Sequence, residues 1–145
     1  MTAALVATGL AGCSSGSASA AVSPAPGALD PACHTAFAAL PATVLGQART
    51  PLAVSGAAAW GEPAIVARCG LPELGPTRTD CQTVDDVDWV VDTSADPTTI
   101  TTYGRSPALE VRIPQSYGQT SASDAAVDLA AVARSLPKTP RSCIG

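Results

Sequence analysis

The sequence predicts a small α+β domain, with N- and C-terminal helices packed on one face of an antiparallel sheet of about four strands. Short runs of alternating or β-branched residues fill the middle of the chain, and Pro and Gly separate them. An apolar stripe at helical spacing follows near the carboxyl end. With 145 residues, the chain is long enough for one globular domain.

Two helices are predicted at the ends of this domain. Asp30-Pro31 is a helix start signal, and Phe37 and Leu40 share one face, so a helix is expected from Asp30 to about Leu40. Residues 121–124 (Ser-Ala-Ser-Asp) resemble a capping box. The apolar stripe that follows predicts a second helix, which Pro137 closes.

The strands are predicted between these helices. The clearest covers residues 109–113, where Leu109, Val111 and Ile113 alternate with polar residues. Alternation or β-branched composition also predicts strands over 63–68, 87–92 and 98–103, with a short one over 51–55. These segments account for a small antiparallel sheet.

The first residues have the pattern of an export signal. Residues 1–12 carry no charge and contain an apolar stretch, and residues 10–13 (Leu-Ala-Gly-Cys) resemble a bacterial lipoprotein signal. That resemblance implies cleavage before Cys13, a diacylglycerol on its thiol, and a new amine open to a further acyl chain such as palmitate. Two or three such chains hold a protein firmly on a membrane. The alternative is an ordinary secreted protein with a coincidental cysteine.

Three segments are therefore expected: a signal peptide over 1–12, a lipidated Cys13 with a flexible tether over 13–29, and a globular domain over 30–145. The tether is predicted because residues 14–29 are uncharged and dominated by Ser, Ala, Gly and Pro. No basic residue precedes Arg49, although such signals normally open with Lys or Arg, so we expect the signal peptide to be truncated at its start. The expected location is the outer face of the cytoplasmic membrane.

Four cysteines remain in the domain, an even number that suits disulfides in an oxidising compartment. Cys69 and Cys81 bracket a loop with Gly and Pro, so we expect them to form a local bridge. Cys33 and Cys143 would then join the ends of the domain. The rival interpretation is a metal site, but no Cys-x-x-Cys pair is present and His34 is the single histidine.

Composition and motifs argue against several functions. A net charge of −4 argues against a nucleic-acid-binding protein, which would need a basic surface. A hydrolase triad lacks candidates, because the single histidine adjoins Cys33 and no Gly-x-Ser-x-Gly motif occurs. We therefore expect no enzyme and no cofactor, although a pair of carboxylates acting as a hydrolase stays open. A cluster of five aspartates (85, 86, 88, 92 and 96) lacks the glycine of a calcium loop, so no metal site is expected.

Four motifs occur in an order that resembles the actinobacterial lipoprotein family catalogued as domain of unknown function 3515. They are residues 58–63 (Ala-Ala-Trp-Gly-Glu-Pro), 68–70 (Arg-Cys-Gly), 87–89 (Val-Asp-Trp) and 103–107 (Tyr-Gly-Arg-Ser-Pro). The resemblance covers about Cys33 to Leu136 and implies a membrane-anchored envelope protein, with no reaction attached.

The motif residues also form the candidate binding surface: Trp60, Glu62, Arg68, Tyr103 and Arg105. Aromatic faces beside Arg and Glu suit a sugar, a peptide or a partner loop. A structural role is the alternative for both tryptophans, since Trp89 fits the core face of its strand and Trp60-Gly61 can shape a turn.

The function expected from these observations is a non-enzymatic binding or scaffolding module, held on the membrane by its lipid and bound to another envelope protein. The alternative is a receptor for a small envelope ligand, such as a muropeptide or a glycan, and a second alternative is a carboxylate-dependent hydrolase.

Overall fold

Eight strands form one antiparallel sheet in the computed structural model, which describes residues 21–144. The α+β class is as predicted, but the expected number of about four strands is wrong. In sheet order the strands are β1 (Thr43–Val44), β2 (Gln47–Thr50), β3 (Ala57–Trp60), β4 (Ile65–Leu71), β8 (Ala108–Ile113), β7 (Thr98–Tyr103), β6 (Val87–Asp92) and β5 (Cys81–Val84).

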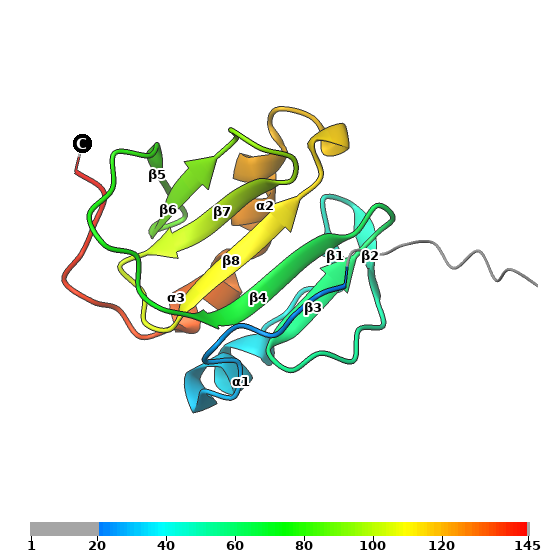
Figure 1. The fold of residues 1–145 in the computed structure, drawn as a ribbon, viewed down its shortest axis with the longest axis horizontal. Coiled ribbons are helices and arrows are strands. Elements are labelled where there is room, and N and C mark those ends of the chain that lie inside the picture. The colour runs from blue at the N-terminus through cyan, green and yellow to red at the C-terminus, as the bar shows by residue number, and fades with distance from the viewer. Residues whose placement is uncertain (1–20, 145) are drawn as a thin grey trace, which may run out of the picture.

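The sheet consists of two meanders, β1 to β4 and β5 to β8, joined where β4 pairs with β8 (Figure 1). Arg68 of β4 lies directly opposite Glu110 of β8 in this pairing. Because side chains alternate along a strand, these two residues share one face of the sheet, and Ala67 and Val111 share the other.

Three short α-helices pack against one face, which we call the inner face. They are α1 (Pro31–Phe37), α2 (Ser121–Asp128) and α3 (Ala130–Ser135); a 3₁₀ turn, η1, covers Gln115–Tyr117. In Figure 1, α2 and α3 lie behind the sheet. Apolar side chains from both layers fill the core between them, including Trp60, Ile65, Trp89, Ile100, Leu109, Leu129 and Val132.

Several elements match their predictions closely. β6 and β7 have the predicted bounds, β8 and β4 overlap the predicted strands, and Asp30 caps α1 by accepting a hydrogen bond from the Ala32 amide. The C-terminal helix is interrupted at Leu129, whose φ of −100° and ψ of 5° depart from the helical region.

The short strand predicted over 51–55 is wrong, because this segment connects β2 to β3 without strand geometry. Four strands had no prediction: β1, β2, β3 and β5. β3 is Ala-Ala-Ala-Trp, and alanine has low strand propensity, yet all four residues are buried. Tertiary packing of small side chains therefore overrides the local preference.

All four domain cysteines are in disulfides, but the expected pairing is wrong. The bonds join Cys33 to Cys69 and Cys81 to Cys143. The sheet order excludes a Cys69–Cys81 bond, because β8, β7 and β6 separate β4 from β5. Adjacent strands are about 4.8 Å apart, so β4 and β5 are separated by four such spacings. The Cα atoms of bridged cysteines lie within about 7 Å of each other.

Each disulfide ties a terminal segment to the sheet. The sequence separations of 36 and 62 residues correspond to about 4 kcal/mol of stabilisation each in the chain-entropy treatment. The first bond holds α1 on β4, and the second holds the C-terminal tail on β5.

Residues 21–29, which were expected to belong to the flexible tether, pack on the sheet instead. Ala25 is buried, and the Gly27 amide donates to the Gly70 carbonyl over 2.8 Å. A Cβ on Gly70 would overlap the backbone of Gly27, so this close approach requires glycine. The segment lies on the face opposite the helices, here called the outer face (Figure 1). The globular domain therefore begins before Asp30.

The predicted signal peptide over 1–12, Cys13 and the first part of the tether lie outside the described residues. Among residues 21–144, the helices are all too short to cross a membrane.

Peptide mapping without reduction tests the disulfides. Trypsin cuts after Arg49, Arg68, Arg78, Arg105 and Arg141, which places the four cysteines on separate peptides. We expect peptide 69–78 linked to the Cys33 peptide, and peptide 79–105 linked to 142–145. Mass spectra showing 69–78 joined to 79–105 would contradict the structure.

Candidate functional site

The predicted binding surface does not form as one site. Trp60 has no exposed surface, faces the core, and donates its indole N–H to the Pro41 carbonyl over 3.1 Å. Trp89 is also in the core, as its alternative interpretation held, and its indole Nε1 finds no acceptor within the described residues. Glu62 lines one hollow, whereas Tyr103 and Arg105 line another.

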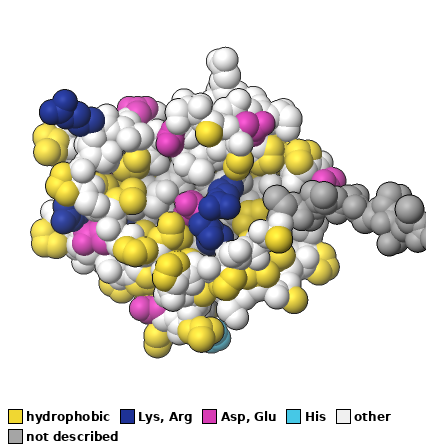
Figure 2. All heavy atoms as spheres, viewed as in Figure 1, with side chains coloured by type: hydrophobic (Ala, Val, Ile, Leu, Met, Phe, Trp, Pro, Cys, Tyr) yellow, Lys and Arg dark blue, Asp and Glu magenta, His cyan; other side chains and the backbone are white. Residues whose placement is uncertain are grey.

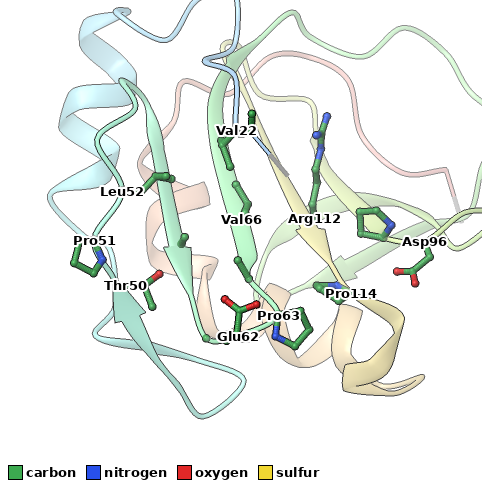
Figure 3. Close-up of a pocket in the computed structure, with 15 residues that line it drawn as sticks. Val22, Thr50, Pro51, Leu52, Glu62, Pro63, Val66, Asp96, Arg112 and Pro114 are labelled. Atoms are coloured by element: carbon green, nitrogen blue, oxygen red, sulfur yellow. The ribbon is translucent and has the colours of Figure 1, made fainter. Parts of the chain in front are cut away.

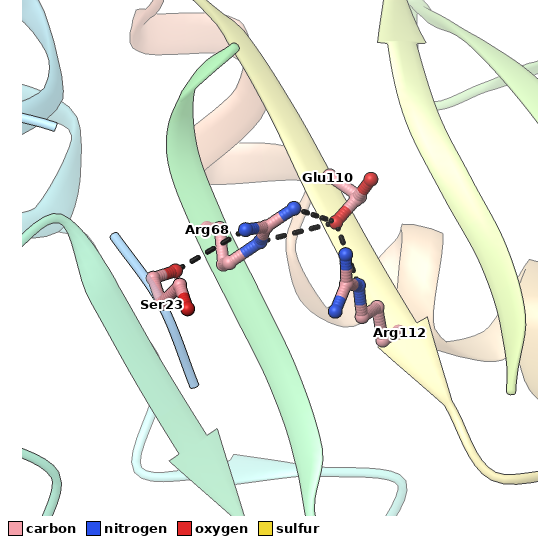
Figure 4. Close-up of polar contacts among 4 residues, drawn as sticks. All are labelled: Ser23, Arg68, Glu110 and Arg112. Atoms are coloured by element: carbon pink, nitrogen blue, oxygen red, sulfur yellow. Dashed lines mark hydrogen bonds and ion pairs between the residues drawn. The ribbon is translucent and has the colours of Figure 1, made fainter. Parts of the chain in front are cut away.

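Arg68 belongs to a three-membered charge cluster on the outer face. Its Nε and Nη2 both donate to Glu110 Oε1, and Arg112 Nε donates to the same oxygen (Figure 4). The second Arg68 amino group, Nη1, donates to the Ser23 carbonyl over 3.2 Å. Arg68 therefore joins β4 to β8 and fastens the N-terminal segment to the sheet.

The outer face has apolar surface around these charges, and basic side chains stand near its centre (Figure 2). Ala59 of β3 and Val66 of β4 lie opposite each other in the sheet, and both side chains are buried. Among residues 21–144 no helix covers this face, and residues 21–29 cover only part of it.

A groove of about 560 Å³ crosses this open part. Its floor contains Val66 and its strand partner Ala59. The segment after β2 forms one wall with Pro51 and Leu52, and Asp96 and Pro114 stand opposite (Figure 3). Val22 of the N-terminal segment closes one end. We call this hollow the sheet-face groove. Its size and apolar floor are typical of a binding site.

Three charged side chains border the sheet-face groove: Glu62, Asp96 and Arg112. Arg112 shares the Glu110 carboxylate with Arg68, so these three side chains together keep one positive charge, while Glu62 and Asp96 make no ion pair with a described residue. Asp96 accepts a hydrogen bond from the Gln115 amide, which fixes its position. The rim therefore presents excess negative charge.

Tyr117 supports the Glu62 end of the groove. Its hydroxyl donates to the Pro63 carbonyl over 2.7 Å. Burial, with a smaller contribution from the nearby Glu62 carboxylate, raises the pKa of Tyr117. The hydroxyl therefore stays protonated, and this hydrogen bond stays intact, above the pH at which a free tyrosine ionises.

A second hollow, of about 220 Å³, lies near the β5 edge of the sheet, and we call it the Arg105 pocket. It forms between the β5–β6 hairpin, the end of β7 and the C-terminal tail. The Cys81–Cys143 disulfide and an antiparallel backbone β-bridge between Arg105 and Lys138 hold the tail in place. The Thr139 amide also donates a hydrogen bond to the Gly104 carbonyl. The lining residues are Thr83, Asp86, Asp88, Tyr103, Arg105, Lys138 and Arg141.

Arg105 is only 7% exposed. Its Nη1 donates to the carbonyls of Arg134 and Leu136, at the C-terminal end of α3. Carbonyls at a helix end attract a cation, which explains why a buried guanidinium is tolerated there. Desolvation lowers the pKa of Arg105, and the Asp88 carboxylate opposes this effect.

The five aspartates do not converge. Asp85 and Asp86, with φ of 47° and 63°, form the turn between β5 and β6. Asp88 accepts hydrogen bonds from Thr83 and from the Cys143 amide. Asp92 accepts from the side chain and backbone of Ser94, and these hydrogen bonds lower its pKa. Within residues 21–144, no three side chains gather as metal ligands.

A comparison with family models shows which protein family the chain belongs to. A model described as "Protein of unknown function (DUF3515)" matches residues 1–140. The chain belongs to this family, as its motifs predicted. No curated protein matches the chain, and no solved structure matches it.

The motif residues that relate the chain to DUF3515 stabilise the fold, and they do not form one shared binding surface. Trp60 and Trp89 build the core, Arg68 holds the β4–β8 junction, and Arg105 caps α3. The groove residues Leu52, Asp96 and Arg112 and the pocket residue Lys138 had no prediction as site residues. Among these four residues only Arg112 had a sequence signal, which was the strand alternation that places it on the face opposite Val111.

The charge cluster gives a stability prediction. Replacing Glu110 with Gln keeps an acceptor oxygen but leaves two guanidinium groups without their shared negative charge, at a site where Arg68 and Glu110 are each only 13% exposed. We expect Glu110→Gln to lower the free energy of unfolding by about 1–3 kcal/mol. The matched control is Glu62→Gln, which removes an exposed carboxylate and should change stability by no more than about 0.5 kcal/mol. Equal urea midpoints for the two variants would refute the structural role.

Proposed function

We propose that this protein is a lipid-anchored, non-enzymatic binding module on the outer face of the cytoplasmic membrane. Its sheet-face groove would bind an extended segment of another envelope protein. The observation that carries the proposal is the position of the groove: Ala21 and Val22, the first described residues after the proposed anchor, line it.

The anchor would keep the groove close to the membrane. The chain advances eight residues from Cys13 to Ala21. At about 3.3–3.6 Å per residue, this segment spans at most about 29 Å. Because residues 21–29 are packed, the usable tether is shorter than the composition suggested. A partner that reaches the groove must therefore present its segment next to the membrane surface.

The lining of the groove indicates the chemistry of that segment. Ala59, Val66 and Leu52 offer apolar contacts without large side chains in the way, which suits an extended backbone. Glu62 and Asp96 stand at the rim and form no ion pair with a described residue. Charge complementarity therefore favours a partner segment with a Lys or Arg between apolar residues.

The nucleophile inventory supports a binding role over an enzymatic one. The four cysteines among the described residues are oxidised in disulfides. His34 is exposed on α1 and lines neither hollow. Acyl transfer would need a nucleophile with a base beside it, and the described residues that line the groove include no cysteine, serine or histidine for such a pair.

Cross-linking in living cells, with mass spectrometry of the linked peptides, tests this function. The variant Glu62→Lys with Asp96→Asn reverses the rim charge and keeps an acceptor for the Gln115 amide. We expect the wild-type protein to link a discrete envelope protein through a segment bearing Lys or Arg. We expect the amount of this cross-linked product to be at least about tenfold lower for the variant, because the paired interface charges are lost.

A matched control is Asp124→Lys with Asp80→Asn, which changes net charge equally on exposed residues outside the groove. It should retain the cross-linked product, whereas Cys13→Ala should lose it through release from the membrane. Equal products from the groove variant and the control would contradict the proposed site. Capture of wall material alone would contradict a protein partner.

A further inference from the structure

The Arg105 pocket holds a buried cation whose hydrogen-bonding capacity is only partly used. Arg105 Nη1 donates to two backbone carbonyls, but Nε and Nη2 donate to no described residue. No carboxylate of the described residues lies at ion-pair distance from this guanidinium. This is unusual because a buried arginine is normally paired with an acid.

These two nitrogens open into the pocket. Among the described residues, the Trp89 indole Nε1 is the one fully buried side-chain nitrogen or oxygen without a partner, so Arg105 Nε and Nη2 are not sealed from solvent. Arg105 lines the pocket, which therefore supplies their opening.

Arg68 shows what this edge of a guanidinium binds in the same protein. Its Nε and Nη2 both donate to one oxygen of the Glu110 carboxylate, Oε1, at 3.1 and 2.7 Å. The Nε–Nη2 edge presents two parallel N–H groups, which match a carboxylate. In Arg68 a side chain of the protein fills this edge, whereas in Arg105 the edge faces the pocket.

Going beyond the proposed function, we infer that the Arg105 pocket binds the carboxylate of a small amino acid or of a peptide C-terminus. Lys138, exposed at the rim, adds a second cation. Arg141 contributes less, since its Nε pairs with Glu73 over 3.2 Å. Asp86 and Asp88 also line the pocket and would accept the amine of a zwitterionic ligand. A volume of about 220 Å³ limits the ligand to a small group.

Nitrogen-15 NMR of the full chain carrying Cys13→Ala, with both disulfides formed, tests this inference. The probes are glycine, N-acetylglycine and glycinamide, observed through the Arg105 Nε–Hε signal. We expect saturable shifts with the two carboxylates and none with glycinamide. Tighter binding of glycine assigns the site to a free amino acid, and equal binding of N-acetylglycine assigns it to a peptide C-terminus.

Two variants separate the site from a structural effect. Arg105→Lys keeps the charge but removes the two parallel N–H groups, so carboxylate binding should disappear. Because this variant has no Arg105 Nε–Hε signal, its binding is followed through the backbone amides of the pocket residues Tyr103 and Lys138. Because this change can also weaken the cap on α3, Lys138→Gln is the second variant. It should weaken binding roughly two- to fivefold, as loss of one partly screened charge does. Arg78→Gln, an exposed arginine that lines neither hollow, is the control and should bind normally.

The inference fails if neither carboxylate saturates the signal at roughly 20 mM, a concentration that fills even a millimolar site. A shift with inorganic phosphate alone would also overturn it, as would equal affinities of the Lys138→Gln and Arg78→Gln proteins.

Discussion

The pairing of β4 with β8 is the interaction on which the rest of the structure depends. It joins two meanders that would otherwise be separate four-stranded sheets. On the inner face, it aligns Ala67 with Val111 in the core. On the outer face, it places Arg68 opposite Glu110, and Val66 beside Arg112 in the groove. Both the charge cluster and the proposed binding surface therefore result from one strand register.

The sequence predicted the elements whose signals are local. Alternation predicted β6 and β8, β-branched composition predicted β7, and Asp30-Pro31 predicted the start of α1. It failed where stability comes from distant contacts. An alanine strand such as β3 has no local signal, because its burial depends on β4 and the core. The disulfide pairing failed for the same reason, since strand order in a sheet is not encoded near Cys69 or Cys81.

The candidate site shows the same limit at the scale of single residues. Ala59 faces the groove and Trp60 faces the core, so one step along β3 decided whether the aromatic ring was a binding or a packing residue. The groove collects residues from as far apart as Val22 and Pro114, and the Arg105 pocket needs the tail that Cys143 holds. Motif order alone could not bring these segments together.

Native-state hydrogen exchange is the measurement that tests most directly whether the two meanders form one cooperative sheet joined at β4 and β8. The account predicts that amides in β4 and β8 exchange only through global unfolding, with the same free energy of opening in both strands, while the edge strands β1 and β5 open earlier. A lower free energy of opening throughout β1 to β4, with β5 to β8 still protected, would contradict it. In that case the groove would lie between two independent units.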